Sequence, residues 1–189
     1  MMPAAYAPGL CHADLMALAV CQFFDARSDR LVRELWARLE EAGVRTMASH
    51  THGNHHPHLS LAVLRTWELR PVRDTLDGLP EGEPFHCASH GSLIFPRGRV
   101  ALAPSFSATV AMRQDRVART LLETGADLHK HYRPGLWLPH VSVATRASAD
   151  QLPVIVNAVA DVLPLELHAV RTALVDSSSG QIWWLPRML

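Results

Sequence analysis

Hydrophobic residues along this chain follow the spacing of strands in some stretches and of helices in others. Residues Leu15–Phe24 form a nearly unbroken apolar run, which is typical of a buried strand. In the next stretch, Ser28–Ala42, apolar residues recur every three or four positions, which predicts an amphipathic helix that ends at Gly43. Its apolar stripe comprises Leu31, Val32, Leu35, Trp36 and Leu39.

The rest of the chain continues to alternate between the two patterns. The first half continues with a strand containing His58, a helix near Glu68–Leu79 and a strand near Phe85–Phe95. The second half is expected to contain a strand Val100–Phe106, a helix Thr109–Thr124, a strand containing His140, a helix Ser148–Leu163, and strands Leu165–Val175 and Gln181–Leu185. In the helix Thr109–Thr124, which is followed by Gly125, the residues expected to face inward are Val110, Val117, Leu121 and Leu122.

Each half therefore has the order strand, helix, strand, helix, strand, which predicts an α+β fold built as an internal repeat. We expect one bilobal domain over residues 1–189, with pseudo-symmetric lobes at about 14–95 and 96–189 that can exchange strands. Each lobe would hold an antiparallel sheet flanked by helices, with a central cleft between the lobes. Residues 1–13 are expected to be a loose leader. The alternative is an ordinary α+β domain whose two halves match by coincidence.

Two segments share the pattern histidine, aliphatic, serine, aliphatic: His58-Leu59-Ser60-Leu61 and His140-Val141-Ser142-Val143. Because side chains alternate across a strand, histidine and serine face one side and the aliphatic residues face the core. A similar tetrapeptide, His90-Gly91-Ser92-Leu93, shows that the pattern also arises by chance. What favours a function for the first two is that each occupies the third element of its half.

Two imidazoles and two hydroxyls on opposite walls of a groove suit phosphoester chemistry. Imidazole titrates near neutral pH, so one histidine can accept a proton while the other donates one. A hydroxyl can donate to a phosphate oxygen. No metal ion is needed for this chemistry. A serine nucleophile is the weaker hypothesis, because serine and histidine point the same way from one strand.

The composition limits the partners. Lys plus Arg and Asp plus Glu are 18 each, so there is no overall basic field for gripping a long nucleic acid. A small anion or the end of a nucleic-acid strand is therefore the more suitable ligand. Three cysteines with no C-x-x-C pair indicate reduced thiols and a cytoplasmic protein. No apolar run is long enough to span a membrane, and Asp14 argues against a signal peptide.

The segment before the first motif contains five histidines within nine residues, at 50, 52, 55, 56 and 58. Such a tract can bind transition metals, but it contains Gly, Asn and Pro, so we favour a mobile loop at the rim of the site and expect no metal. Tyr132, Arg133 and Trp137 are candidates to contact the substrate by stacking or charge, Trp137 alternatively being a core residue. Trp183 and Trp184 should face opposite sides of the last strand, and Arg146 is interpreted as a surface charge.

The paired motifs, the Pro-His steps Pro57-His58 and Pro139-His140, and the segment Trp137–Ala144 resemble the two-histidine (2H) phosphoesterase superfamily. The most similar branch comprises the bacterial 2′-5′ RNA ligase-like proteins, which act as RNA 2′,3′-cyclic phosphodiesterases. The resemblance implies a bilobal α+β fold, His58 and His140 as the acid–base pair, Ser60 and Ser142 as phosphate ligands, and no metal or cofactor. Serine stands at both positions where threonine is common, so the hydroxyl is retained.

The sequence therefore favours a metal-independent phosphodiesterase that hydrolyses 2′,3′-cyclic phosphates on RNA ends or small nucleotides. We expect no membrane association and no obligate protein partner. Three alternatives stay open: a non-catalytic module that binds RNA ends or phosphoesters, a 2′-5′ RNA ligase, and a metal-dependent hydrolase built on the histidine-rich segment.

Overall fold

A computed structural model describes residues 17–189. The expected leader and the first two residues of the first expected strand lie outside this range. The elements are β1 (Leu18–Phe24), α1 (Ala26–Glu41), β2 (His58–Thr66), α2 (Leu69–Asp77), β3 (Phe85–Phe95), β4 (Arg99–Ser105), α3 (Ala108–Glu123), β5 (Asp127–Leu128), the 3₁₀ turn η1 (Lys130–Tyr132), β6 (Val141–Ala144), the 3₁₀ turn η2 (Ala149–Gln151), α4 (Leu152–Ala160), β7 (Leu165–Asp176) and β8 (Ile182–Trp184). No helix within the described range is long and apolar enough to cross a membrane.

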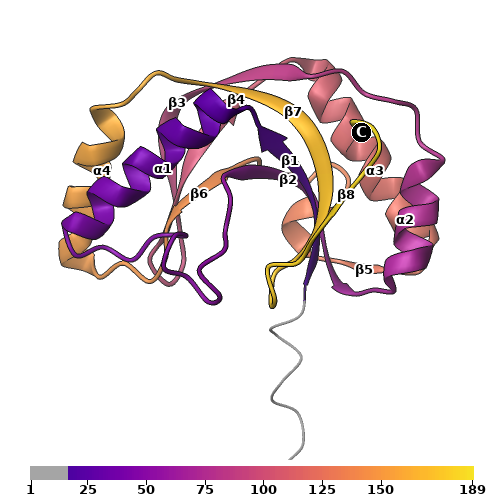
Figure 1. Cartoon of the computed structure of the whole chain (residues 1–189), viewed down its shortest axis with the longest axis horizontal. Helices are drawn as coiled ribbons and strands as arrows, with labels where there is room; N and C mark the ends of the chain where they lie inside the picture. Colours follow the sequence, from indigo (N-terminus) through magenta and orange to yellow (C-terminus); the bar gives the residue numbers. More distant parts are fainter. Residues whose placement is uncertain (1–16) are drawn as a thin grey trace, which may run out of the picture.

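The strands form one eight-stranded antiparallel sheet in the order β5-β2-β1-β7-β3-β4-β6, with β8 added on β7. The long strand β7 joins the two parts of the sheet. Its first residues, Leu165–Ala169, pair with β3, and Ala169–Asp176 pair with β1. Figure 1 shows β7 arching over the molecule between the two helix pairs. The predicted α+β fold is confirmed.

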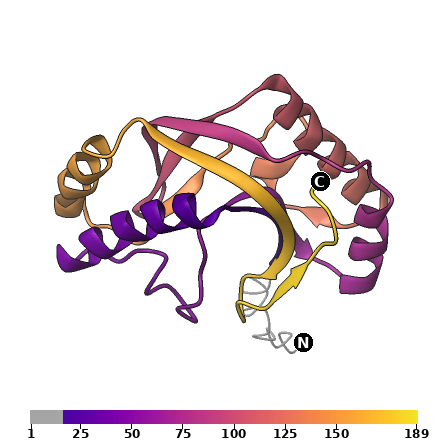
Figure 2. The same ribbon diagram turned by 45° about the horizontal axis from the view of Figure 1, so that its top comes forward.

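Two helix pairs lie at opposite ends of the sheet (Figures 1 and 2). Helices α1 and α4 pack together and contact β6 and β3, whereas α2 and α3 pack together and α3 contacts β2 and β5. The core is accordingly divided into two main hydrophobic clusters, one under each pair. Elements from residues 14–95 and from 96–189 contribute to both ends of the sheet. The division into two lobes at those boundaries stays a prediction.

Local signals in the sequence account for the ends of the two long helices. The Asp25 carboxylate caps α1 by accepting a hydrogen bond from the Ser28 amide at 2.8 Å. Gly43 and Gly125, which follow α1 and α3, have φ angles of +78° and +80°, which only glycine adopts without strain. The inward placement of Leu122 was wrong. Leu122 is 38% exposed because it follows Leu121, the last buried residue of α3, and therefore points away from the buried face of the helix.

The structure brings the two motif strands together even though they are distant in sheet order. Strand β2 lies next to the β5 edge, and β6 is the opposite edge strand, yet β2 and β6 contact each other. An isolated bridge between Thr46 and Ala144 ties the segment after α1 to β6. The segment between Thr46 and His58 therefore runs from one motif strand to the other, and it carries the histidine-rich tract.

Candidate active site

The two motifs adopt the predicted alternation. Leu59 and Leu61 of β2 are fully buried in the core, as are the matching aliphatic residues of β6, Val141 and Val143. His58 is the first residue of β2, and His140 immediately precedes β6. Both histidines are half-buried on the opposite side of their strands. We refer to His58, Ser60, His140 and Ser142 as the two-histidine site.

The two imidazoles are anchored in the same way. Nδ1 of His58 lies 2.7 Å from the carbonyl oxygen of His56, and Nδ1 of His140 lies 2.8 Å from that of Leu138. A carbonyl oxygen only accepts hydrogen bonds, so each Nδ1 must carry the proton that it donates. The neutral form of each ring consequently has a free lone pair on Nε2. Each histidine is thereby set up to accept or release a proton at Nε2.

Burial sets the charge of this pair. Removal from water lowers the pKa of His58 below its ordinary value of about 6.5. Burial also lowers the pKa of His140, and the positive charges of His58, His131 and Arg99 lower it further. The two imidazoles are therefore close enough to couple, so that protonation of one opposes protonation of the other. With no anion bound, both are mostly neutral at pH 7.

Two tryptophans support the backbone of the motif serines. The indole Nε1 of Trp36 in α1 donates to the carbonyl oxygen of Ser142 at 3.2 Å. The Nε1 of Trp137 donates to the carbonyl oxygen of Ser60 at 3.1 Å. Each motif strand is thus held by an indole from a segment distant in the sequence. Sequence reasoning placed Trp36 in the helical stripe but did not assign it this bond, because the bond depends on α1 packing against β6.

A buried polar group of α3, the helix that packs on β2, also positions this strand. The Gln114 side chain of α3 is 2% exposed, and its Nε2 donates to the carbonyl oxygens of Leu61 and Tyr132 at 3.0 Å each. This pair of bonds fixes the strand of the first motif relative to the turn that precedes the second motif. Sequence reasoning missed Gln114, because its polar side chain interrupts the apolar stripe of α3.

The Ser60 hydroxyl lies between a thiol and a phenol. Its Oγ is 3.7 Å from Sγ of Cys21 on the neighbouring strand β1, and it is near enough to the Tyr132 hydroxyl to favour the ionised form of that phenol. Burial raises the pKa of Cys21 to about 12 and raises the pKa of Tyr132 above its usual value. Both groups stay protonated at neutral pH. Cys21 therefore does not offer a thiolate nucleophile, and both groups can support the serine hydroxyl.

Aromatic rings border each histidine. Phe23 of β1 is the register partner of His58, and the ring centroids are 6.0 Å apart. Phe95 of β3 lies 5.0 Å from the His140 ring. Trp184 packs 4.9 Å from Phe23, is 40% exposed, and carries the Arg171 guanidinium 3.8 Å above its ring. The sequence predicted none of the contacts of the two phenylalanines, although the alternation within β1 places Phe23 on the same face as Cys21.

The three residues predicted to contact the substrate occupy different environments. Tyr132 is buried and belongs to the core, and its ring centroid lies 6.3 Å from that of His140. Trp137 is partly buried, packs against both main clusters and stacks on Phe106 at 5.1 Å. The Arg133 side chain lies over β5, where Nε donates to the Leu128 carbonyl and Nη2 is 3.9 Å from Asp127. A role of these residues in substrate contact stays a prediction.

The histidine-rich segment packs on itself and on the β7–β8 turn. The His55 ring centroid lies 5.6 Å from that of His50 and 4.1 Å from that of His52, and the His52 ring lies so close to Gly180 that a Cβ there would clash with it. Burial and the neighbouring histidines lower the pKa of His55 to about 4. Within residues 17–189, no three His, Cys, Asp or Glu side chains are arranged to hold a metal ion.

Comparison with known proteins places this chain in the class of the two-histidine phosphoesterases. The family model of the 2′-5′ RNA ligase superfamily matches residues 28–181, so the chain belongs to that superfamily. No curated protein sequence matches the chain significantly.

Solved structures share the fold at low sequence identity. Usb1 of Kluyveromyces marxianus is 15% identical with a TM-score of 0.53, and the match covers 92% of this chain and 99% of Usb1. A phosphoesterase structure is 13% identical with a TM-score of 0.60 and coverages of 92% and 95%. E. coli LigT, solved in complex with NADP⁺, is 14% identical with a TM-score of 0.59 and coverages of 90% and 94%. At these identities the likeness concerns the fold.

Proposed function

We propose that this protein hydrolyses 2′,3′-cyclic phosphates, on RNA ends or on nucleotides, by general acid–base catalysis without a metal ion. The observation that supports it most is the matched anchoring of His58 and His140 through Nδ1, which leaves two Nε2 atoms for proton transfer. A binding module needs hydrogen-bond donors, but it does not need two proton-transfer groups prepared in the same way.

The reaction uses one neutral and one protonated imidazole. The neutral Nε2 takes a proton from the water that attacks phosphorus, and the protonated Nε2 gives its proton to the ribose oxygen that leaves. A P–O bond to water forms, the ring P–O bond breaks, and the product is a phosphomonoester beside a free hydroxyl. Each proton transfer contributes on the order of 10²–10⁴-fold to the rate. The Ser60 and Ser142 hydroxyls donate to the non-bridging oxygens and hold the phosphate in line.

The negative charge of the substrate stabilises the protonated imidazole that the site otherwise disfavours, and the proton itself comes from solvent. Burial and mutual repulsion keep both histidines neutral when no anion is present. A cyclic phosphate carries one negative charge, which raises the pKa of the nearer imidazole and lets it become protonated. The coupling between the two rings then opposes a second proton. The pair thus reaches the singly protonated state that the reaction requires when the substrate binds.

We also propose that the protein works in the cytoplasm. Cys21 and Cys87 are free and buried, which agrees with a protein that works in the reducing cytoplasm. Because RNA fragments that end in a cyclic phosphate arise from RNA cleavage, the reaction belongs to RNA processing.

The test is hydrolysis of nucleoside 2′,3′-cyclic monophosphates and of a short RNA with a cyclic phosphate end, in excess EDTA. Wild type is compared with His58→Ala and His140→Ala, and His90→Ala is the matched control, because His90 is an exposed histidine in the chance tetrapeptide of β3. We expect turnover by wild type and by the control only, and the product identifies which ring bond breaks.

Each alternative gives a different result in the same assay. Binding without turnover by wild type indicates a phosphoester-binding module. Joining of two RNA ends indicates a ligase. Loss of activity in EDTA, with recovery on adding Zn²⁺, indicates a metal-dependent hydrolase. Any of these results overturns the proposal.

A further inference from the structure

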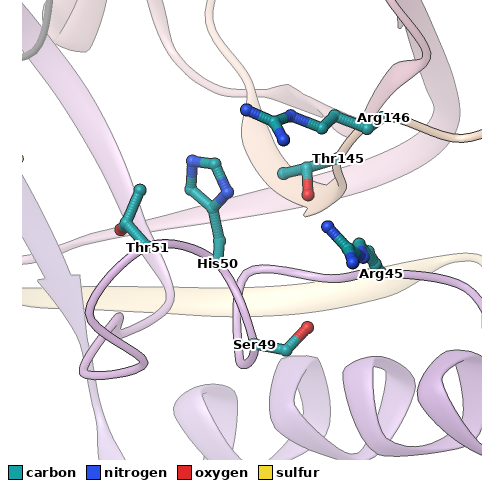
Figure 3. Close-up of a pocket in the computed structure, with 6 residues that line it drawn as sticks. All are labelled: Arg45, Ser49, His50, Thr51, Thr145 and Arg146. Atoms are coloured by element: carbon teal, nitrogen blue, oxygen red, sulfur yellow. The ribbon is translucent and has the colours of Figure 1, made fainter.

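A separate polar pocket of about 180 Å³ lies near the two-histidine site. It is lined by Arg45, Ser49, His50, Thr51, Thr145 and Arg146, shown in Figure 3. These residues come from two segments, the one after α1 and the one after β6. The Thr145 amide donates to the Arg45 carbonyl oxygen at 2.9 Å, which continues the bridge between Thr46 and Ala144 and holds the two segments together. We call this space the arginine pocket.

The lining of the arginine pocket is suited to an anion. It presents two guanidinium groups, an imidazole and three hydroxyls, and no carboxylate. In Figure 3, the guanidinium groups of Arg45 and Arg146 extend toward the same space, with the Thr145 side chain between them. Within residues 17–189, neither arginine forms an ion pair through its side chain. Guanidinium groups bind phosphate oxygens strongly because their donors match the geometry of the anion.

The backbone around the arginine pocket is held in an uncommon conformation. Thr51 and Arg146 have φ angles of 45° and 54°, and Arg97 is the third non-glycine residue with positive φ in the described part of the chain. Positive φ is costly for a β-branched residue such as threonine. Strained backbone of this kind gathers at sites where function depends on a fixed geometry. Two of the three strained residues line this one pocket.

The pocket lies close to the two-histidine site. Thr145 follows Ser142 by three residues, a separation of about 10 Å along an extended chain. The charge of Arg99 lowers the pKa of both His140 and His50, so Arg99 lies within electrostatic range of both sites. On the other side, His50 stacks on His55, whose pKa is also lowered by His58. A molecule with two phosphates can therefore reach both sites at once.

We propose that the arginine pocket binds a second phosphate group of the substrate while the first reacts at the two-histidine site. This inference rests on the proposed function and narrows its substrate to cyclic phosphates that carry at least one further phosphate. Two sources share this chemistry: the phosphodiester of an oligonucleotide with a cyclic phosphate end, and the 5′-phosphate of a single nucleotide. A nucleoside with the cyclic phosphate alone leaves the pocket empty and is the poorer substrate.

The kinetic test compares three substrates: adenosine 2′,3′-cyclic monophosphate, the same compound with a 5′-phosphate, and a diadenosine dinucleotide with a cyclic phosphate end. We expect wild type to turn over at least one of the two-phosphate compounds with a kcat/KM about tenfold or more above that of the first. The compound with the higher value identifies the source of the second phosphate. Equal kcat/KM for all three overturns the proposal.

Arginine variants tie this preference to the pocket. In the Arg45→Gln/Arg146→Gln double variant, the ratio of kcat/KM between the preferred two-phosphate substrate and the monophosphate should fall about tenfold or more, since each guanidinium contributes a charge-assisted hydrogen bond. Arg73→Gln is the matched control, because Arg73 is an exposed arginine on α2 at the other end of the sheet. A ratio that stays at the wild-type value in the double variant contradicts the proposal.

Binding of inorganic phosphate separates the pocket from the catalytic proposal. Burial and the charges of Arg146, Arg99 and His52 lower the pKa of His50, and a bound anion should raise it. NMR titration of His50, assigned with His50→Gln, should show this rise with phosphate in wild type and in His58→Ala/His140→Ala, but not in Arg45→Gln/Arg146→Gln. A rise without turnover by wild type leaves the pocket standing and removes the proposed function. Turnover by wild type without this rise in the His50 pKa supports the proposed function and overturns phosphate binding in the arginine pocket.

Discussion

Trp36 and Trp137 donate from their indole nitrogens to the carbonyl oxygens of Ser142 and Ser60, respectively, so each motif serine is braced by a tryptophan. Trp36 lies in the middle of α1, and Trp137 lies three residues before His140. The two bonds restrain the strands at the residues that carry the hydroxyls. Both bonds run between segments distant in the sequence, so they also restrain the approach of the two halves of the chain.

Replacing Trp36 with phenylalanine should destabilise the protein and slow catalysis. The substitution leaves the Ser142 carbonyl without its donor and opens a gap in a site that is 1% exposed. We expect a loss of about 2–4 kcal/mol in the free energy of unfolding, from the lost hydrogen bond and the reduced packing. Urea unfolding measures it. Trp184→Phe is the control, since that indole is exposed; a Trp36→Phe protein as stable as this control would contradict the bracing role.

The pH dependence of kcat/KM should have its optimum on the acid side of 6.5. The reaction requires one protonated and one neutral imidazole, and the pKa values of His58 and His140 in the free enzyme are both lowered from 6.5. The protonated member is therefore lost as the pH rises through the lowered pKa values, and the neutral member is lost at lower pH. A bell-shaped profile measured with a cyclic phosphate checks this. An optimum well above pH 7 would show that burial does not set the charge of the pair.

Stability should also fall as the medium becomes acidic. Six histidines have pKa values lowered by burial in the folded protein: His50, His55, His56, His58, His129 and His140. The unfolded chain binds more protons below about pH 6.5, so their contribution is fully present above that pH and is lost as the pH falls through the folded values. The unfolding free energy should thus decrease from pH 7 to pH 5. A constant value across this range would contradict the shifts.

The two buried thiols should be inert. Cys21 and Cys87 are buried, and burial raises the pKa of each to about 12. In a Cys11→Ser protein, we expect no reaction with a thiol reagent at pH 8 until the chain is unfolded in guanidinium, and no loss of activity during the exposure. Rapid labelling of the folded protein with loss of turnover would indicate a reactive thiolate beside Ser60.

Much of this architecture follows from local patterns in the sequence. The stripe of α1, its stop at Gly43 and the alternation at Leu59 and Leu61 depend on neighbours within a few residues, and the structure matches them. The two-residue strand β5 has no such signal, because two residues are too few to show a hydrophobic period. Only its backbone pairing with β2 defines it as a strand.

Contacts between distant elements were beyond the reach of those patterns. The bond from Trp36 to Ser142 requires α1 to cross to β6, and the position of Phe95 beside His140 requires β3 and β4 to pair. Arg146 has the sequence context of a surface charge. The bridge from Thr46 to Ala144 and the hydrogen bond from the Thr145 amide to the Arg45 carbonyl oxygen bring it to Arg45 and form the arginine pocket.

The central claim is that His58 and His140 act as one acid–base unit without a metal ion. Its most direct test is kcat/KM for a 2′,3′-cyclic phosphate in EDTA, measured for wild type, His58→Ala, His140→Ala and the double variant. We predict a loss of about 10²–10⁴-fold in each single variant, and little further loss in the double variant, because groups that act as a unit are not additive. A single variant that keeps more than a tenth of the wild-type value would contradict the account.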